Sequence, residues 1–339
     1  MAANGRIEGD SVVLDDEKEA SALYAKGSFG EPLSGGALRL TLLEATYLAS
    51  EGRLKVRGAT AADLVAAGAR ADPAFEALLA VHSDLRGRGL VGRRGPGERL
   101  LVFARGARPG KDAADAVVLA LRERAPIRPA RLAEEAAATE AGGRRFLAAL
   151  TDEEGDVTHY KVVVDDPRGS TPEPTGPTAP VDAVVLFDHV LVPDAPKRLR
   201  AAGYGTGAGA GLQLPFLDAL HLARAGWLRV PGGEAALRAA ARERAPDLDL
   251  REAVHRDLRA RGLLVRTGFK FGTHFRAYRK GTQEEHAPYL VHALREDAAE
   301  DAARVAGFVR LAHAVRKRLL FALVGEGDVR YVALERTKP

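Results

Sequence analysis

The sequence predicts an α/β protein of the α+β type, built as a tandem duplication. Each copy is expected to contain a small mixed α/β module followed by a larger module with a mixed sheet. Three observations lead to this prediction. The chain has 339 residues, 46% of them hydrophobic, which is enough for more than one domain with its own core. Segments with helical and strand periodicity alternate along it. Blocks of the first half recur in the second half at a nearly constant offset.

The repeat is visible in four blocks. Residues 40–56 resemble residues 214–230 (214 − 40 = 174), and residues 81–90 resemble residues 254–263 (254 − 81 = 173). A period of this length is the size of a domain, so it indicates a duplication and not a solenoid of short repeats. The two further matching blocks are 120–123 with 293–296, and 154–157 with 326–329.

The periodicity also predicts individual elements. Residues 39–49 have the apolar spacing of a helix, which Gly52 ends, and residues 53–56 are typical of a strand. The glycine-rich stretch 203–211 lacks the Lys-Ser/Thr ending of a phosphate loop and is expected to be a flexible loop. In the second copy we expect a helix ending at Arg261, strands at 263–265, 269–278 and 289–294, a helix at 297–316, and a hairpin of 319–324 with 329–334 that turns at 325–328.

These elements suggest domain boundaries. A proline-rich polar stretch separates the two copies and is expected to be an extended linker. The expected units are 1–58 and 59–166 for the small and large modules of copy 1, 167–180 for the linker, and 181–231 and 232–339 for the two modules of copy 2.

Composition limits the function. The absence of cysteine excludes disulfides, thiolate metal sites and a cysteine nucleophile. No leader peptide pattern opens the chain and no apolar run approaches the roughly 20 residues that span a bilayer, so we expect a cytoplasmic protein without a membrane partner. The net charge of +4 and the pI of about 9.3 permit nucleic-acid binding without requiring it.

The two copies differ at polar positions within a shared apolar frame. Three polar groups of copy 2 are replaced in copy 1. Their joint replacement indicates that copy 1 has lost a catalytic activity that copy 2 retains. The expected pairs are Tyr278 with Phe103, His286 with about Ala113, and Lys317 with Arg145.

These residue types suit RNA cleavage through the ribose 2′-hydroxyl, which needs a base, an acid and a cation but no metal. Histidine transfers protons near neutral pH, and lysine supplies a compact charge for a phosphate oxygen. Tyrosine is a weak base at its usual pKa of about 10, although nearby cations favour its phenolate. The cations expected near Tyr278 are Arg276, Arg279 and Lys280.

The residues alone leave other interpretations open. A tyrosine at a strand end often only packs, a histidine before Ala-Pro is often on the surface, and a lysine between arginines is often solvated. One alternative is a metal-dependent nuclease on a similar fold, for which Glu284, Glu285 and Glu296 are the nearby carboxylates. The other is a non-catalytic structural or RNA-binding subunit.

The stretch 261–272, together with Tyr278, His286 and the Val315-Arg316-Lys317 block, resembles the archaeal tRNA-splicing endonucleases (tRNA-intron endonucleases) of the two-unit homodimeric type. The resemblance implies a restriction-endonuclease-like fold for the large modules, without a metal or cofactor. It implies excision of introns from precursor tRNA at bulge-helix-bulge sites, with 2′,3′-cyclic phosphate and 5′-hydroxyl ends. The roles it implies are general base for Tyr278, general acid for His286 and transition-state stabiliser for Lys317.

The resemblance further implies how RNA and a second chain are held. Arg310 and a second arginine, Arg336 in preference to Arg330, are expected to sandwich a flipped bulge base. An acidic turn is expected to dock into a basic cleft on the catalytic unit of a partner in a homodimer. Strands 162–164 and 332–334 are expected to supply the apolar part of that contact. The acidic residues of the turn are Asp152, Glu153, Glu154 and Asp156.

Overall fold

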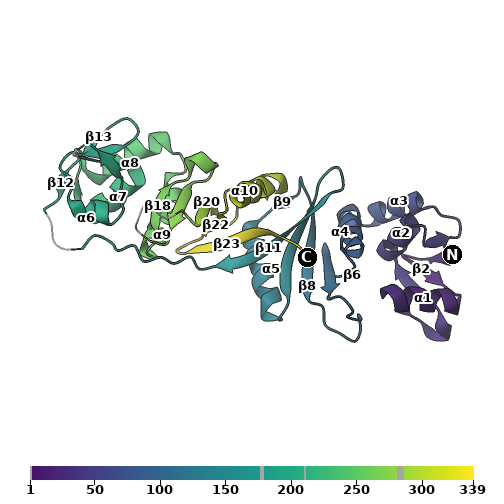
Figure 1. Ribbon diagram of the computed structural model, residues 1–339. Coiled ribbons are helices and arrows are strands. Elements are labelled where there is room, and N and C mark those ends of the chain that lie inside the picture. The colour runs from purple at the N-terminus through teal and green to yellow at the C-terminus, as the bar shows by residue number, and fades with distance from the viewer. Residues whose placement is uncertain (1, 176–178, 210, 281–285) are drawn as a thin grey trace.

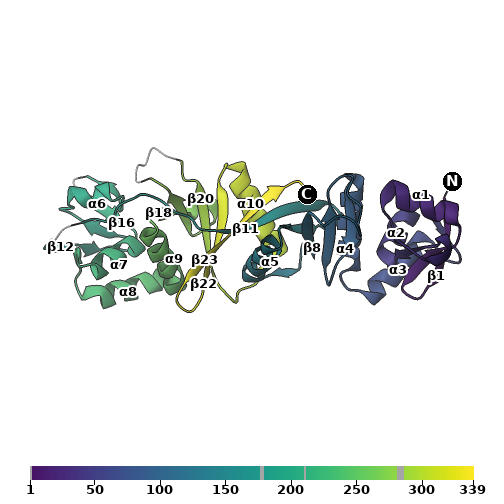
Figure 2. The same ribbon diagram turned by 90° about the horizontal axis from the view of Figure 1, so that it is seen from below.

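The fold is seen in a computed structural model, which describes residues 2–175, 179–209, 211–280 and 286–339. Four modules follow one another in a row (Figure 1). The N-terminus lies at one end of the row, and the C-terminus lies near its middle (Figure 1). Figure 2 shows the same order of modules from below. Helices and strands recur in the same order in both halves, which confirms the predicted α/β tandem duplication.

The small module of copy 1 is a five-stranded sheet covered by helices. Its elements are β1 (Ala3–Glu8), β2 (Ser11–Leu14), α1 (Glu17–Gly27), β3 (Glu31–Pro32), η1 (Ser34–Gly36), β4 (Leu38–Thr41), α2 (Leu42–Ser50), β5 (Leu54–Val56) and α3 (Ala61–Ala71). The strand order is β3-β4-β2-β1-β5. The helix predicted at 39–49 begins at Leu42, because Arg39 belongs to β4 and the Thr41 side chain caps the helix in a capping box with Glu44.

The small module of copy 2 repeats this plan with shorter strands. Its elements are β12 (Val181–Asp182), β13 (Val184–Val185), β14 (Val190–Val192), α6 (Lys197–Ala201), β15 (Thr206–Ala208), β16 (Gly211–Leu214), α7 (Phe216–Arg224), β17 (Leu228–Arg229) and α8 (Gly233–Arg244). β15 pairs with β16, so the glycine-rich stretch 203–211 is not a loop throughout, contrary to the prediction.

The large modules share one ten-stranded sheet. Copy 1 contributes α4 (Phe75–Gly87), β6 (Val91–Arg94), β7 (Arg99–Phe103), β8 (Ala116–Arg122), β9 (Pro126–Ile127), α5 (Pro129–Ala141), β10 (Arg145–Thr151) and β11 (Val157–Asp165). Copy 2 contributes α9 (Leu248–Ala260), β18 (Leu264–Thr267), η2 (Phe269–Phe271), β19 (Phe275–Tyr278), β20 (Tyr289–Arg295), β21 (Glu300–Asp301), α10 (Ala302–Ala314), β22 (Arg318–Val324) and β23 (Val329–Thr337).

The two copies meet where β11 pairs antiparallel with β23. The strand order is β18-β19-β20-β22-β23-β11-β10-β8-β7-β6. The five strands of copy 2 are followed by the equivalent strands of copy 1 in reverse order. Val162 pairs with Leu334, its own counterpart at an offset of 172 residues (334 − 162 = 172), so a pseudo-two-fold axis passes near this pair. Strands 162–164 and 332–334, expected to supply the apolar part of the contact between chains, pair with each other within one chain and satisfy each other's backbone groups there.

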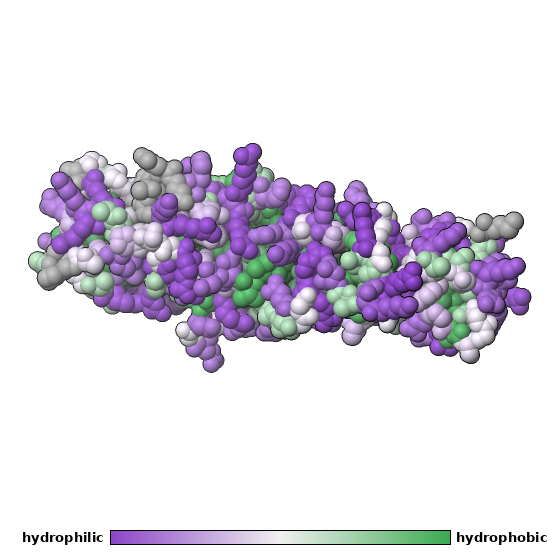
Figure 3. Space-filling view, turned by 60° about the horizontal axis from the view of Figure 1, so that its bottom comes forward, coloured by the Kyte–Doolittle hydropathy of each residue, from purple (hydrophilic) through white to green (hydrophobic). Residues whose placement is uncertain are grey.

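The core continues across this junction. Side chains of both copies, including Val162 and Leu334, form one buried cluster beneath α5 and α10. The opposite face of the sheet is covered separately by α4 in copy 1 and α9 in copy 2. Figure 3 shows a mostly polar surface with hydrophobic side chains gathered near the middle of the molecule, where the copies meet. The shared core makes the two large modules one structural unit.

Two elements of copy 2 differ from the prediction. The strand expected at 269–278 begins only at Phe275, because residues 269–271 form a 3-10 turn that Gly272 ends with a φ of 62°. The helix expected at 297–316 begins at Ala302 and ends at Ala314. It starts late because Glu300 and Asp301 form β21, which pairs with β9 of copy 1.

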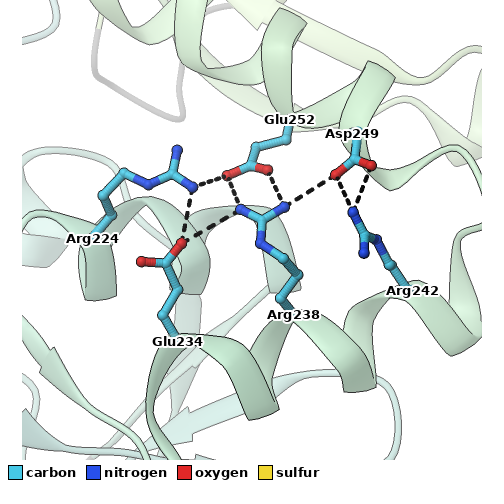
Figure 4. Close-up of polar contacts among 6 residues, drawn as sticks. All are labelled: Arg224, Glu234, Arg238, Arg242, Asp249 and Glu252. Carbon is cyan, nitrogen blue, oxygen red and sulfur yellow. Dashed lines mark hydrogen bonds and ion pairs between the residues drawn. The ribbon is translucent and has the colours of Figure 1, made fainter.

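A network of ion pairs holds the small module of copy 2 on its large module (Figure 4). Arg238 lies at its centre, with a guanidinium nitrogen 2.7 Å from a carboxylate oxygen of Glu252. Ion pairs near the surface contribute little singly, but a network of them fixes orientation. It joins three helices through Arg224 of α7, Glu234, Arg238 and Arg242 of α8, and Asp249 and Glu252 of α9 (Figure 4).

Candidate active site

Three neighbouring strands of copy 2 bring their ends to one edge of the sheet. β19 is antiparallel to β20, and β20 is parallel to β22, so the end of β19 lies beside the starts of the other two strands. Tyr278 is the last residue of β19, and Lys317 immediately precedes β22. The topology therefore gathers residues that lie about 40 positions apart in the sequence (317 − 278 = 39).

The register places Tyr278 and Lys317 in one cross-strand row. Arg276 pairs with Leu290, a residue of the core beneath α10. Two residues nearer the edge, the same register sets Tyr278 opposite Pro288 and Pro288 opposite Lys317. Side chains two residues apart in a strand share a face, so Tyr278 and Arg276 lie on the α10 side of the sheet. With neighbouring strands about 4.8 Å apart, the backbones of Tyr278 and Lys317 are separated by roughly 10 Å.

Lys317 is held by a backbone contact next to His286. Its ammonium Nζ donates to the carbonyl oxygen of Ala287 at 2.6 Å. Burial lowers the pKa of Lys317, and the positive charge of Arg276 lowers it further. The charge of this lysine is thus fixed in position at the edge of the sheet.

The end of α10 sets the position of Lys317. The backbone N–H of Arg316 donates to His313 O at 3.0 Å, and that of Lys317 donates to Ala312 O at 2.8 Å, which together make a Schellman motif. Arg316 adopts a φ of 54°, in the left-handed region that disfavours residues with a Cβ. The corresponding residue of copy 1, Gly143, has a φ of 71° without that cost.

Replacing Arg316 by glycine is expected to raise the free energy of unfolding by about 0.5–1 kcal/mol, because it relieves the left-handed strain at the cost of some chain entropy. Urea denaturation of both proteins measures the difference. The matched change Gly143→Ala in copy 1 is expected to lower stability. A less stable Arg316→Gly variant would show that the exposed Arg316 side chain makes a stabilising contact that outweighs the strain.

Tyr278 is half-buried. The chain segment between the two copies forms backbone hydrogen bonds next to it. The backbone N–H of Ser170 donates to Arg279 O at 2.7 Å, and that of Thr171 donates to Gly262 O at 2.7 Å. Gly169 approaches Gly262 so closely that a Cβ at Gly169 would lie 2.3 Å from the Gly262 oxygen. This part of the segment 167–180 therefore braces the strand that ends in Tyr278.

His286 is the first described residue after the gap at 281–285, and its side chain is exposed. It immediately precedes buried Ala287, the residue whose carbonyl oxygen binds Lys317. The position of His286 is thus linked to that of Lys317 through one peptide bond and one hydrogen bond. The structure thus brings Tyr278 and Lys317 into one row and sets His286 beside it.

The strand register also relates these residues to copy 1. Tyr278 pairs with the first residue of β18, as Phe103 pairs with the first residue of β6, so Phe103 is its counterpart. The counterpart of Lys317 is Arg144 and not Arg145 as predicted, because Arg144 closes the same Schellman motif through its N–H to Thr139 O at 3.2 Å. The offset is 173 residues here, one more than the sequence comparison assumed (317 − 144 = 173).

Two of the three arginines predicted to bind RNA share a pocket. Arg310 and Arg336 are exposed and line a pocket of about 270 Å³ at the junction of the copies, with buried Tyr160 of copy 1. Burial raises the pKa of Tyr160, and the positive charges of Arg336 and Arg310 oppose that rise. Arg330 lies toward the other end of β23 and forms an ion pair with Glu296. The structure therefore groups Arg336, and not Arg330, with Arg310.

The acidic turn of copy 1 is exposed and shaped by one of its own carboxylates. Asp152 Oδ1 accepts from the backbone N–H groups of Glu154 at 3.1 Å and Asp156 at 2.8 Å. Glu153 lies 3.3 Å from Arg124. Asp152 and Asp156 also line the pocket that holds the two arginines.

Two further histidines of copy 2, His274 and His292, pack against each other. Their rings stack with centroids 4.4 Å apart. Burial lowers the pKa of His274 to about 4 and that of His292 to about 3. Within the described residues, no three His, Asp or Glu side chains gather as metal ligands do. Glu284 and Glu285 lie outside the described residues.

The cations around Tyr278 differ from those predicted. Arg276 shares its face of the sheet, whereas Arg279 points its guanidinium at the hydroxyl of Tyr289, with Nε at 3.0 Å. Arg266, which the sequence prediction omits, lies on the neighbouring strand β18. The sequence does contain one difference that bears on Arg266: Glu44 of copy 1 corresponds to Asp218 of copy 2. That difference could not be interpreted without the structure, because only the folded chain shows that Asp218 lies near Arg266.

Across the described residues, no helix is both long and apolar enough to cross a membrane.

Comparison with known proteins matches both halves of the chain. The family model described as the tRNA intron endonuclease N-terminal domain matches residues 3–65 and 181–240. The model for the catalytic C-terminal domain of the same family matches residues 75–159 and 248–331. The matched ranges cover most of the chain and fit a duplication of both domains.

Full-length relatives agree. The tRNA-splicing endonuclease of Methanococcoides burtonii is 34% identical over 343 residues, which cover 96% of this chain and 97% of the relative. That of Methanosarcina acetivorans is 35% identical, covering 98% and 99%. That of Natronomonas pharaonis is 34% identical, covering 93% and 94%. These findings confirm the resemblance: the chain belongs to the tRNA intron endonuclease family and is an enzyme that carries the two domains of that family twice.

Proposed function

We propose that this enzyme excises introns from precursor tRNA by metal-independent cleavage at bulge-helix-bulge sites, leaving 2′,3′-cyclic phosphate and 5′-hydroxyl ends. The main support is the row of strand ends in copy 2. It presents a half-buried tyrosine, a fixed ammonium and an adjacent exposed histidine at one edge of the sheet. Copy 1 has phenylalanine where copy 2 has Tyr278.

In this mechanism Tyr278 takes the proton of the ribose 2′-hydroxyl. The 2′-oxygen forms a bond to phosphorus while the bond from phosphorus to the 5′-oxygen breaks. His286 gives its proton to the departing 5′-oxygen, so charge and protons balance. Lys317 places its ammonium against the phosphate oxygens, where negative charge builds in the transition state. The backbones of Tyr278 and Lys317 lie roughly 10 Å apart with Pro288 between them, so both side chains can reach toward one phosphate placed over Pro288.

This function is tested by single-turnover cleavage of a bulge-helix-bulge RNA in excess EDTA. We expect cleavage by the wild type, with a cyclic phosphate on the 5′ fragment. Cleavage that requires an added divalent metal would instead favour a metal-dependent nuclease. Tight binding without cleavage, with or without metal, would favour a non-catalytic RNA-binding subunit.

We propose that Arg310 and Arg336 hold a bulge base of the RNA between them. Their shared exposed pocket and the planar faces of guanidinium groups support this role. Replacing Arg310 or Arg336 by alanine is expected to weaken RNA binding by about 1–3 kcal/mol, the usual contribution of stacking on one base. Filter binding at fixed salt measures it. Arg330→Ala is the matched control, because Arg330 pairs with Glu296, and an equal loss in that variant would contradict the assignment.

We also propose a homodimer in which the acidic turn of one chain docks on copy 2 of the other. A cleft of about 180 Å³ between the modules of copy 2 is lined by Arg244 and Arg251, which complement the charge of the turn. Glu154→Lys is expected to raise the dimer dissociation constant at least about tenfold, or 1.4 kcal/mol. Sedimentation velocity measures it. Glu326→Lys, in the matching turn of copy 2, is the control. Unchanged association of the Glu154→Lys chain would exclude this contact.

A further inference from the structure

Arg266 is a charged side chain whose terminal nitrogens are buried without a hydrogen bond. Its side chain is 10% exposed, and within the described residues neither Nη1 nor Nη2 has a hydrogen-bond partner. The nearest carboxylate oxygen, Oδ2 of Asp218, lies 3.8 Å away. Buried charges are costly unless they are paired and hydrogen-bonded, so an orphaned guanidinium requires an explanation.

Copy 1 shows what this arginine does when both of its terminal nitrogens are hydrogen-bonded. Arg93 is the counterpart of Arg266 (266 − 93 = 173). It donates to Glu44 Oε1 at 2.8 Å and to Gly30 O at 2.7 Å. Glu44 also accepts from the backbone N–H of Gly30 at 3.0 Å. In copy 1 the arginine is thus tied to the small module by a direct ion pair.

In copy 2 the same carboxylate position is taken by a shorter residue. Asp218 accepts from the backbone N–H of Gly205 at 3.1 Å, as Glu44 does from that of Gly30. Its other oxygen lies 2.9 Å from Nε2 of His255, which leaves Arg266 beyond hydrogen-bond distance. The carboxylate of copy 2 therefore hydrogen-bonds to the histidine and keeps only a longer ion pair of 3.8 Å with the arginine.

This arginine lies next to Tyr278. Leu264 pairs with Tyr278, and Arg266 pairs with Arg276, so Arg266 and Tyr278 are diagonal neighbours on adjacent strands. Long side chains reach across such a diagonal. Burial lowers the pKa of Arg266, whereas Asp218 and then Tyr278 act to raise it, which agrees with this proximity. Both terminal nitrogens are buried, so a phosphate in solvent does not reach them, and the available partner lies within the protein.

We propose that Arg266 is a positioning residue that stabilises the phenolate of Tyr278, and that the shortening of the carboxylate from Glu44 to Asp218 makes it available for this role. The inference rests on the proposed function of Tyr278 as base. It explains two differences between the copies together, since copy 1 lacks both the arginine without hydrogen bonds at its terminal nitrogens and the hydroxyl. Among the described residues, the other charged or titratable groups of this region are Arg276 on β19, Arg279 and Lys280 after it, Asp218 and Arg259 beyond Arg266, and His286 and Lys317 at the same edge.

Three variants test the inference by single-turnover cleavage from pH 6 to 9. Arg266→Gln is expected to lower the rate at pH 7 by about tenfold or more. The deficit is expected to shrink as the pH rises, because the Tyr278 hydroxyl then loses its proton without help from the arginine. Asp218→Glu restores the carboxylate of copy 1 and is expected to produce the same deficit by capturing Arg266. Glu44→Asp makes the reverse change in copy 1 and is expected to leave the rate unchanged. Thermal denaturation of each variant monitors folding.

The outcomes separate this inference from the proposed function. Tyr278→Phe provides the reference rate without the base. If Tyr278→Phe cleaves as fast as the wild type, the proposed function of Tyr278 fails. If Tyr278→Phe is inactive but Arg266→Gln cleaves normally at every pH, the role of Arg266 is overturned and the function stands. A deficit in Arg266→Gln that is constant across pH would mean that Arg266 acts only as a structural clamp.

Discussion

Replacing His286 by alanine is expected to slow single-turnover cleavage of a bulge-helix-bulge RNA by about 10²- to 10⁴-fold, the usual contribution of one general acid. Without a proton donor, the 5′-oxygen must leave as an alkoxide. RNA binding is expected to change little, because the side chain is exposed and acts only on the leaving group. Rapid-quench measurement of the cleavage rate, with filter binding of the same RNA, separates the two effects.

His313→Ala is the matched control for this experiment. His313 is also exposed and lies on α10 four residues before Lys317, so its loss removes the same side chain from a nearby surface. We expect nearly wild-type cleavage from it. An equal loss in both variants would point to a general effect of charge or folding. A substrate with a leaving group that needs no proton should restore cleavage in His286→Ala alone.

The duplication could be predicted from the sequence because both copies keep their apolar frames. Strands such as β8 and β20 are mostly hydrophobic, and the same offset of about 173 residues recurs along the chain. Tyr278 and Lys317 could be proposed because copy 1 has a different residue in each place, phenylalanine for the tyrosine and arginine for the lysine. The row that they share could not be predicted, because it depends on the register of three strands.

The junction between the copies could not be predicted. β11 and β23 are both amphipathic and have free edges within their own copies, so the sequence does not say whether each pairs within the chain or with another chain. The same is true of β9 and β21, two-residue strands too short to leave a periodic pattern. Their pairing is a long-range contact that decides where α10 begins.

The position of Arg266 marks another limit of sequence reasoning. Glu44 and Asp218 are chemically alike, and a comparison of the copies treats their exchange as conservative. One methylene decides whether the carboxylate reaches the arginine at 2.8 Å or leaves it at 3.8 Å. Only the folded chain shows that difference.

Replacing Lys317 by alanine is expected to slow the cleavage step by about 10²- to 10³-fold, which corresponds to roughly 2.7–4 kcal/mol of transition-state stabilisation. The ammonium is fixed by Ala287 O at 2.6 Å and by the Schellman motif behind it, so little reorganisation is needed when charge builds on the phosphate. Since the interaction strengthens only in the transition state, the rate constant falls and RNA affinity changes less.

Two further variants make this prediction specific. Lys317→Arg keeps the charge and copies Arg144 of the first copy, but a planar guanidinium does not fit the place of a compact ammonium, so only partial activity is expected. Lys270→Ala removes an exposed lysine from the turn before β19 and is expected to cleave normally. If Lys317→Ala weakened binding as much as it slowed cleavage, Lys317 would be a ground-state phosphate contact. The stabilisation of the transition state would then have to come from the arginines beside Tyr278, and Arg276→Ala would become the variant with the larger loss of rate.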